Sequence, residues 1–128
     1  VSDQYVPYPF PQECGNKEDV RWAALTNARG QGVLVLMDAP MAFSALRFTP
    51  GDLNRAEHPY DLNPRRNFTA CVDYKQCGLG NGSCGPLVLD SYALYGGTID
   101  FGFALRPCRP QDGYIAELAR LRLPDIHV

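Results

Sequence analysis

The chain has 128 residues, of which 45 % are hydrophobic, and its net charge at pH 7 is −2. This length suffices for one domain and not for two, and a domain of this size can bury a real core. The lack of a basic excess argues against nucleic acid as the main partner, and no apolar run approaches the ~18 residues that would cross a membrane.

The first half of the chain predicts strands and one short helix. Residues 5–12 contain three prolines among aromatic residues, which predicts an irregular extended segment. Three later stretches have the composition or alternation of β-strands: 20–26, 30–38 and 42–48. We expect the strand at 30–38 to be buried on both faces. Residues 49–59 predict one short helix, or a turn or two of it. Thr49 suits the N-cap, Pro50 the first helical position and Asp52 a capping box.

The second half predicts further strands and a closing helix. Residues 67–74 alternate between apolar and polar positions, and residues 98–106 do so most clearly of all. The glycine pair 96–97 is typical of a hairpin turn, with 92–95 as the incoming strand. Residues 112–124 change to a helical period, and the aspartate at their start can cap the helix.

These elements predict a mainly β fold, an antiparallel β-sandwich with two short helices, in one domain that spans residues 1–128. No repeated strand–helix unit is present, which argues against a Rossmann fold or an eightfold barrel within this chain. The alternating patterns place Trp22, Phe101 and Phe103 in the predicted core.

The loop GLGNGSCGP, residues 78–86, has four glycines between two predicted strands. It does not match a dinucleotide fingerprint, because Ser83 replaces the third glycine and no helix follows. The loop lacks the Gly-Lys-Ser/Thr of a Walker motif, and it is one residue short of the G-x-S-x-G pattern of a nucleophile turn. Nothing local supplies a base for a Cys84 thiolate. The remaining interpretation is a loop that lines some other site.

Other reactive side chains have a structural interpretation beside a functional one. His58 stands at the predicted helix end, where it can meet the last carbonyls, and His127 lies beside the C-terminus. The acidic cluster of Glu13, Glu18 and Asp19 suits acid–base work in a glycosidase or, more commonly, solvated loop charges.

The cysteine count is odd: five, at positions 14, 71, 77, 84 and 108. Their spacing fits no zinc pattern, so we expect no metal ligands and favour buried free thiols. Residues 67–69 and 81–83 are formal glycosylation sequons, which carry weight only if the protein is secreted. We favour the cytoplasm and leave secretion open. The chain begins with Val1 and shows no leader, so we expect it to be processed or excised from something longer.

Several motifs, taken in order, resemble a known family. They are YPFPQECGNKEDVRW (8–22), FSALRFTPGDLNRAEHPYDL (43–62), CVDYKQCGLGNGSCGP (71–86) and the Phe101-Gly102-Phe103 stretch. The pattern resembles the C-terminal domain, or small chain region, of the glycoside hydrolase family 2 β-galactosidases. The resemblance covers about residues 8–106 and leaves a helical tail, roughly 107–128, outside it.

The resemblance implies the second, C-terminal half of a β-supersandwich domain of the galactose-mutarotase type. In the family this domain follows a barrel that carries both catalytic glutamates, so we expect no catalytic residue and no cofactor in this chain. The glycine-rich loop reaches the sugar pocket in the family, which implies substrate binding by Asn81, Ser83 and Cys84. Cys84 stands where a relative has a Trp that stacks on the sugar, and a thiol offers no such face.

The leading functional hypothesis is therefore the C-terminal β-sandwich portion of a β-galactosidase. Carboxylates outside this chain would perform the retaining hydrolysis of a terminal β-galactoside, and the remainder of the parent enzyme would be the main partner. The alternatives are a stand-alone, non-catalytic carbohydrate-binding β-sandwich and a purely structural module. Bare sheet edges also predict pairing with other chains as a homo-oligomer.

Overall fold

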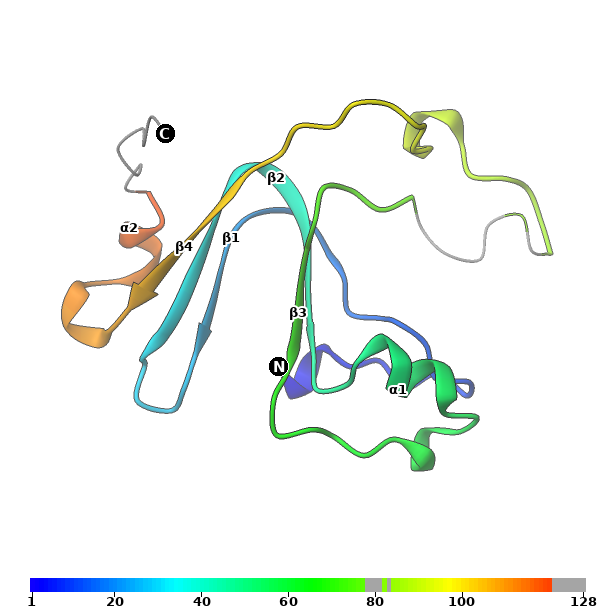
Figure 1. The fold of residues 1–128 in the computed structure, drawn as a ribbon, viewed down its shortest axis with the longest axis horizontal. Coiled ribbons are helices and arrows are strands. Elements are labelled where there is room, and N and C mark those ends of the chain that lie inside the picture. The colour runs from blue at the N-terminus through cyan, green and yellow to red at the C-terminus, as the bar shows by residue number, and fades with distance from the viewer. Residues whose placement is uncertain (78–81, 83, 121–128) are drawn as a thin grey trace. The chain divides into compact units, whose positions relative to one another are not determined.

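The computed structural model describes residues 1–77, 82 and 84–120 (Figure 1). The strands are β1 (Lys17–Thr26), β2 (Gly32–Leu46), β3 (Thr69–Asp73) and β4 (Phe103–Cys108), and the helices are α1 (Pro50–Arg55) and α2 (Ile115–Leu118). The fold is thus mainly an open antiparallel sheet with two short helices, as expected of a β-sandwich type of domain, and the predicted fold class is confirmed.

The long strand β2 is central to the sheet. Its first part, Gly32–Met37, pairs antiparallel with β4, and its last part, Ala42–Leu46, pairs antiparallel with β3. The prediction of two separate strands at 30–38 and 42–48 is therefore wrong, because the chain stays extended through Pro40. Proline is compatible with extended backbone, and Pro40 falls between the two paired stretches, where neither β3 nor β4 needs its missing N–H.

The chain divides into two compact units, the first formed by residues 1–19 with the described part of 41–98. Its core contains Leu46, Phe48 and Leu53, with Tyr5 packed edge-on against Phe48 at 5.1 Å between ring centroids. The predicted capping box at Thr49 is present. The helix is shorter than 49–59, and its C-cap, Ala56, is already extended.

The second unit is formed by residues 20–40 with the described residues from 99 onward. Leu34, Cys108 and Leu118 form its buried cluster, so α2 covers one face of the β2–β4 pair. The predicted helix over 112–124 is only partly correct. Asp112 caps a separate 3-10 turn, Pro110–Asp112. Gly113, at φ +107°, breaks the helical backbone between this turn and α2. Residues 121–124 lie outside the described part.

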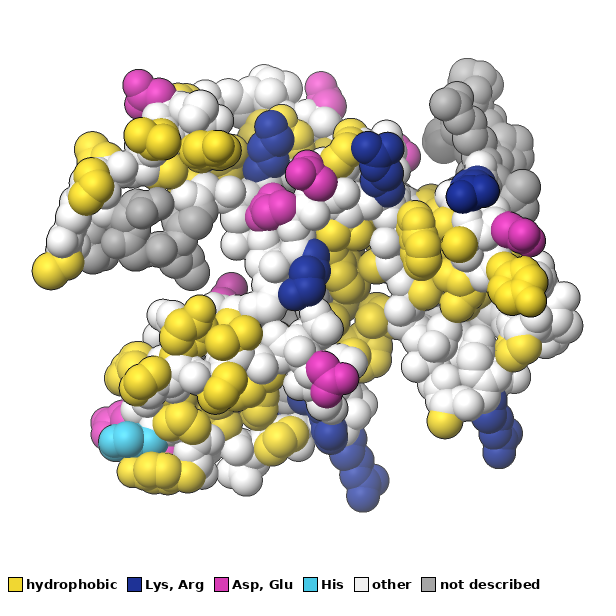
Figure 2. All heavy atoms as spheres, turned by 180° about the vertical axis from the view of Figure 1, so that it is seen from behind, with side chains coloured by type: hydrophobic (Ala, Val, Ile, Leu, Met, Phe, Trp, Pro, Cys, Tyr) yellow, Lys and Arg dark blue, Asp and Glu magenta, His cyan; other side chains and the backbone are white. Residues whose placement is uncertain are grey.

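The predicted hairpin around Gly96 and Gly97 is wrong. Residues 92–95 form no strand, and β4 begins only at Phe103, where it pairs with β2. The core assignment is also wrong for three aromatic residues, since Trp22, Phe101 and Phe103 are 40 %, 51 % and 45 % exposed. Figure 2 shows many hydrophobic side chains, in yellow, uncovered at the surface. No helix in the described residues is long and apolar enough to cross a membrane.

Candidate functional site

The three residues predicted to bind substrate belong to the glycine-rich loop after β3. Asn81 and Ser83 lie outside the described residues, whereas Cys84 is an exposed free thiol. Gly82 has φ +82° and donates its backbone N–H to the Pro86 carbonyl at 3.1 Å. A Cβ at position 82 would also press on Leu87, so this turn requires glycine. The described part of the loop is thus an exposed turn, and its contact with a sugar stays a prediction.

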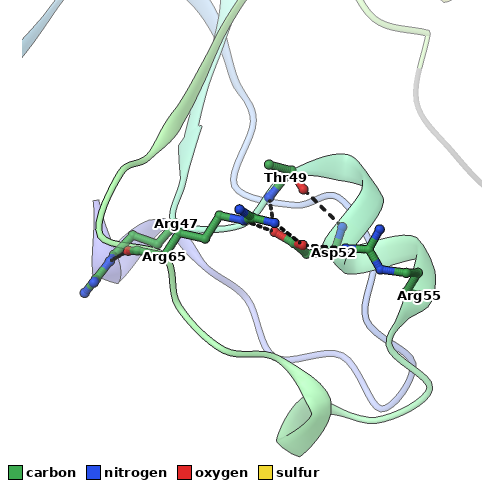
Figure 3. A network of polar contacts seen from close by, with 5 residues as sticks. All are labelled: Arg47, Thr49, Asp52, Arg55 and Arg65. Atoms are coloured by element: carbon green, nitrogen blue, oxygen red, sulfur yellow. Dashed lines mark hydrogen bonds and ion pairs between the residues drawn. The ribbon is translucent and has the colours of Figure 1, made fainter.

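The most connected polar group in the described residues is Asp52, in the first turn of α1 (Figure 3). Arg65 donates to both carboxylate oxygens, from Nε at 2.5 Å and from Nη2 at 2.8 Å. Arg55 Nη2 donates to Oδ1 at 2.8 Å, and the Thr49 backbone N–H donates to Oδ2 at 2.9 Å. Two parallel hydrogen bonds from one guanidinium to one carboxylate fix the relative positions of the two side chains.

A second pair of bonds ties the Arg65 segment to the end of β2. Arg47 Nε donates to the Arg65 carbonyl at 2.8 Å, and the Arg65 backbone N–H donates to the Arg47 carbonyl at 2.9 Å. Figure 3 shows the two arginines side by side, with the Arg65 guanidinium directed toward Asp52. The network therefore joins three segments: the end of β2, the start of α1 and the loop before β3.

The charges in this network explain its role. The Arg65 guanidinium, together with the bonds from Thr49, holds the pKa of the Asp52 carboxyl well below its usual range, and Asp52 in turn raises the pKa of Arg65. A carboxylate held in its ionised form, with both oxygens occupied by donors, is suited to fastening loops and not to delivering a proton. Asp52 is therefore a structural residue.

The other singled-out side chains do not gather into a catalytic constellation. Glu13, Glu18 and Asp19 are all exposed, as expected of solvated loop charges. His58 does not meet the carbonyls of α1. It precedes the 3-10 turn Pro59–Asp61, and its ring stacks on Tyr60 at 4.9 Å between centroids. His127 lies outside the described residues, and within the described part no three His, Cys, Asp or Glu residues are placed to bind a metal.

The thiols differ in environment. Cys108 is buried, as predicted, but Cys84 and Cys77 are exposed, and Cys14 and Cys71 are half-buried. Cys14 and Cys71 both line a small cavity in the first unit, and the Cys14 sulfur accepts the Val6 backbone N–H at 3.2 Å. The prediction of buried thiols is therefore right for one position and wrong for the two exposed ones, which lie on loops outside the sheet.

Comparison with known protein families gives a match over most of the chain. Residues 1–105 match the family described as beta galactosidase small chain. The match ends inside β4, so α2 and the residues after it lie outside it.

Individual relatives agree with the family match. The chain is 44 % identical to a beta-galactosidase of Priestia megaterium over 62 % of its own length and 8 % of that protein's. It is 37 % identical to a beta-galactosidase of Halalkalibacterium halodurans, over 73 % of this chain and 10 % of the relative. It is 40 % identical to beta-galactosidase BgaC of Bifidobacterium adolescentis, over 62 % of this chain and 8 % of the relative. The chain thus spans a tenth or less of each of these three relatives.

Proposed function

Because the chain belongs to the beta galactosidase small chain family, we propose that it is the C-terminal β-sandwich portion of a β-galactosidase. The parent enzyme hydrolyses terminal β-galactosides with retention, using two carboxylates that lie outside this chain. The chain itself supplies no cofactor and no catalytic group. The single observation that carries this proposal is the family match over residues 1–105.

The proposed contribution of this chain to the sugar pocket is the loop 78–86. Asn81, Ser83 and Cys84 contact the galactoside, and the glycines let the backbone approach it closely. The exposure of Cys84 and the turn at Gly82 support this proposal, because a loop that must reach a ligand cannot be buried in its own domain.

The role of Cys84 is one of shape, since a small side chain leaves room that a larger one would fill. In the parent enzyme, Cys84→Trp is expected to change KM for aryl galactosides, because a ring adds a stacking surface beside the sugar. Cys84→Ser keeps the size and serves as the matched control, with kcat nearly unchanged. Loss of turnover in a folded Cys84→Ser enzyme would show that the sulfur takes part in the chemistry.

The isolated chain is expected not to hydrolyse β-galactosides, because the proposal assigns both carboxylates to the remainder of the enzyme. A chromogenic galactoside assay on chain purified free of host enzyme measures this directly. Turnover clearly above that of a buffer blank would contradict the proposal.

A stand-alone carbohydrate-binding β-sandwich is the second candidate, and it is favoured by the exposed aromatic rings of Tyr60, Tyr92 and Tyr95. Such rings can stack on sugar faces without any catalysis. Isothermal titration of the chain with galactose and lactose separates the two candidates: binding by the chain alone favours this second one, and no binding favours the first. We also propose that bare sheet edges allow copies of the chain to pair.

A further inference from the structure

One face of the β2–β4 strand pair is apolar and, apart from Val35 and Met37, exposed in the described residues. In the antiparallel register Val33 lies opposite Pro107, Val35 opposite Leu105 and Met37 opposite Phe103. Residues directly opposite one another point to the same side of a sheet, as do alternate residues of one strand. These six side chains therefore share one side, which we call the open face: Val33, Val35, Met37, Phe103, Leu105 and Pro107.

The opposite face of the same two strands is covered by α2. Leu34 is 0 % exposed there and packs with Cys108 against Leu118 of α2. On the open face, by contrast, Leu105 is 63 % exposed and Phe103 and Val33 are exposed as well, whereas Val35 between them is only 3 % exposed. The strand pair thus has one face covered by α2 and one apolar face that is largely exposed, although the outer face of an antiparallel sheet is usually polar.

The composition of the open face limits its occupant. All six side chains are apolar and none is charged or a strong hydrogen-bond donor. Such a face is not suited to a nucleic acid or a charged peptide, each of which brings charged groups that would stay unpaired. A contiguous apolar surface of this kind is the mark of a protein interface.

We propose that the open face packs against an apolar surface of the parent β-galactosidase outside residues 1–128, which completes the second layer over β2 and β4. This inference rests on the proposed function. The curated relatives exceed the matched part about tenfold in length, so most of such an enzyme lies outside this chain. A segment of the same enzyme is held at a high effective concentration, which favours it over a second copy of the chain.

The first experiment uses the parent enzyme without substitution. Hydroxyl-radical footprinting followed by mass spectrometry compares Leu105 with Leu34, which is the internal standard for a buried leucine. The expected result is that Leu105 is labelled as weakly as Leu34, and that this protection persists when the enzyme is diluted to its protomers. Strong labelling of Leu105 would overturn the inference. Protection that disappears on dilution would also overturn it, because it identifies another copy of the enzyme as the occupant.

A photo-crosslinker then identifies the occupant. Leu105→p-benzoylphenylalanine in the parent enzyme is expected to crosslink to a segment outside residues 1–128 of the same protomer. Tyr114→p-benzoylphenylalanine is the control, because Tyr114 is an exposed aromatic residue at the start of α2 and not on the open face. A crosslink between two protomers, or capture of the same segment from position 114, would contradict the inference. Galactosidase activity is measured separately, so an inactive parent enzyme counts against the proposed function and an active enzyme without the crosslink counts against this interface.

Discussion

At the scale of single residues, Asp52 is the best-defined electrostatic feature of the chain. It is bonded to Thr49 and to two arginines, and its carboxyl has a lowered pKa in the folded state. A carboxyl whose folded pKa is depressed contributes stability that is fully present well above its unfolded pKa of about 3.9 and is lost as the pH falls below that value. The contribution of Asp52 to stability should therefore depend on pH in the acidic range.

The corresponding experiment compares wild type with Asp52→Asn in urea unfolding over a series of pH values. Asp52→Asn is expected to be less stable at neutral pH, because Asn cannot pair with the Arg65 guanidinium as an ion. The difference should narrow as the pH falls from about 5 to about 2, because the Asp52 carboxyl of the unfolded wild type takes up its proton in this range while that of the folded state stays ionised. A difference that stays constant over this range would show that charge is not what Asp52 contributes.

The neighbouring arginines provide a matched control for the geometry. Arg65→Lys keeps the charge and loses the two parallel bonds to Asp52, so it should destabilise the chain at neutral pH. Arg66→Lys changes an exposed neighbour in the same way and should have little effect. Equal losses from both changes would point to a general effect of lysine in this loop.

Half of this network could be predicted from the sequence. The capping box between Thr49 and Asp52 is a local signal between residues three positions apart, and the structure confirms it. Arg65 was not predictable, because it stands 13 residues from Asp52 and reaches it only after the chain has turned back through the Pro59–Asp61 turn. No spacing rule in the sequence relates two residues that a loop brings together.

At the scale of elements, Gly32 shows how closely β1 and β2 approach each other. A Cβ at this position would meet the backbone carbonyl of Leu25 and would also lie too close to Thr26 Cα. Backbone atoms of a paired strand cannot move aside as the end of a side chain can. Gly32→Ala is therefore expected to shift the hairpin and to cost about 1–3 kcal/mol of unfolding free energy.

Gly51 in α1 is the matched control for this substitution. A Cβ there would have its nearest neighbour, an Arg55 side-chain nitrogen, at 3.4 Å. Gly51→Ala should therefore be neutral or stabilise the chain by up to about 1 kcal/mol, because alanine favours the helix. Thermal or chemical unfolding of the two variants gives the comparison, and similar losses from both would mean that the space around Gly32 is not what matters.

The strand predictions show what alternation can and cannot reveal. Residues 67–74 correctly indicated a strand, because β3 lies within them. Residues 98–106 also indicated a strand, but its predicted partner, residues 92–95, is wrong. Residues 92–95 form no strand, and β4 pairs with β2. A period of two residues reports that one side of a strand is apolar. It does not report which strand lies beside it, since that depends on residues far away in sequence.

At the scale of the whole molecule, the wrong core assignment is informative. The alternating pattern placed Phe103 in the core, yet this side chain is 45 % exposed. Phe103 belongs to neither of two clusters of buried residues, Leu46, Phe48 and Leu53 in the first unit and Leu34, Cys108 and Leu118 in the second. The proposed packing of the open face against the parent enzyme would cover Phe103 and account for the alternation.

This difference between covered and open faces predicts unequal effects of two similar substitutions in the isolated chain. Leu34 is fully buried, so Leu34→Ala leaves a cavity and should cost about 2–5 kcal/mol of unfolding free energy. Leu105 is largely exposed on the neighbouring strand, so Leu105→Ala should change the stability by less than about 1 kcal/mol. Urea unfolding at several protein concentrations measures both changes. In the parent enzyme the cost of Leu105→Ala should rise toward that of Leu34→Ala, because the same methyl groups are then buried. If both substitutions cost the same in the isolated chain at every concentration, the chain covers Leu105 by itself and the two faces of the β2–β4 pair do not differ.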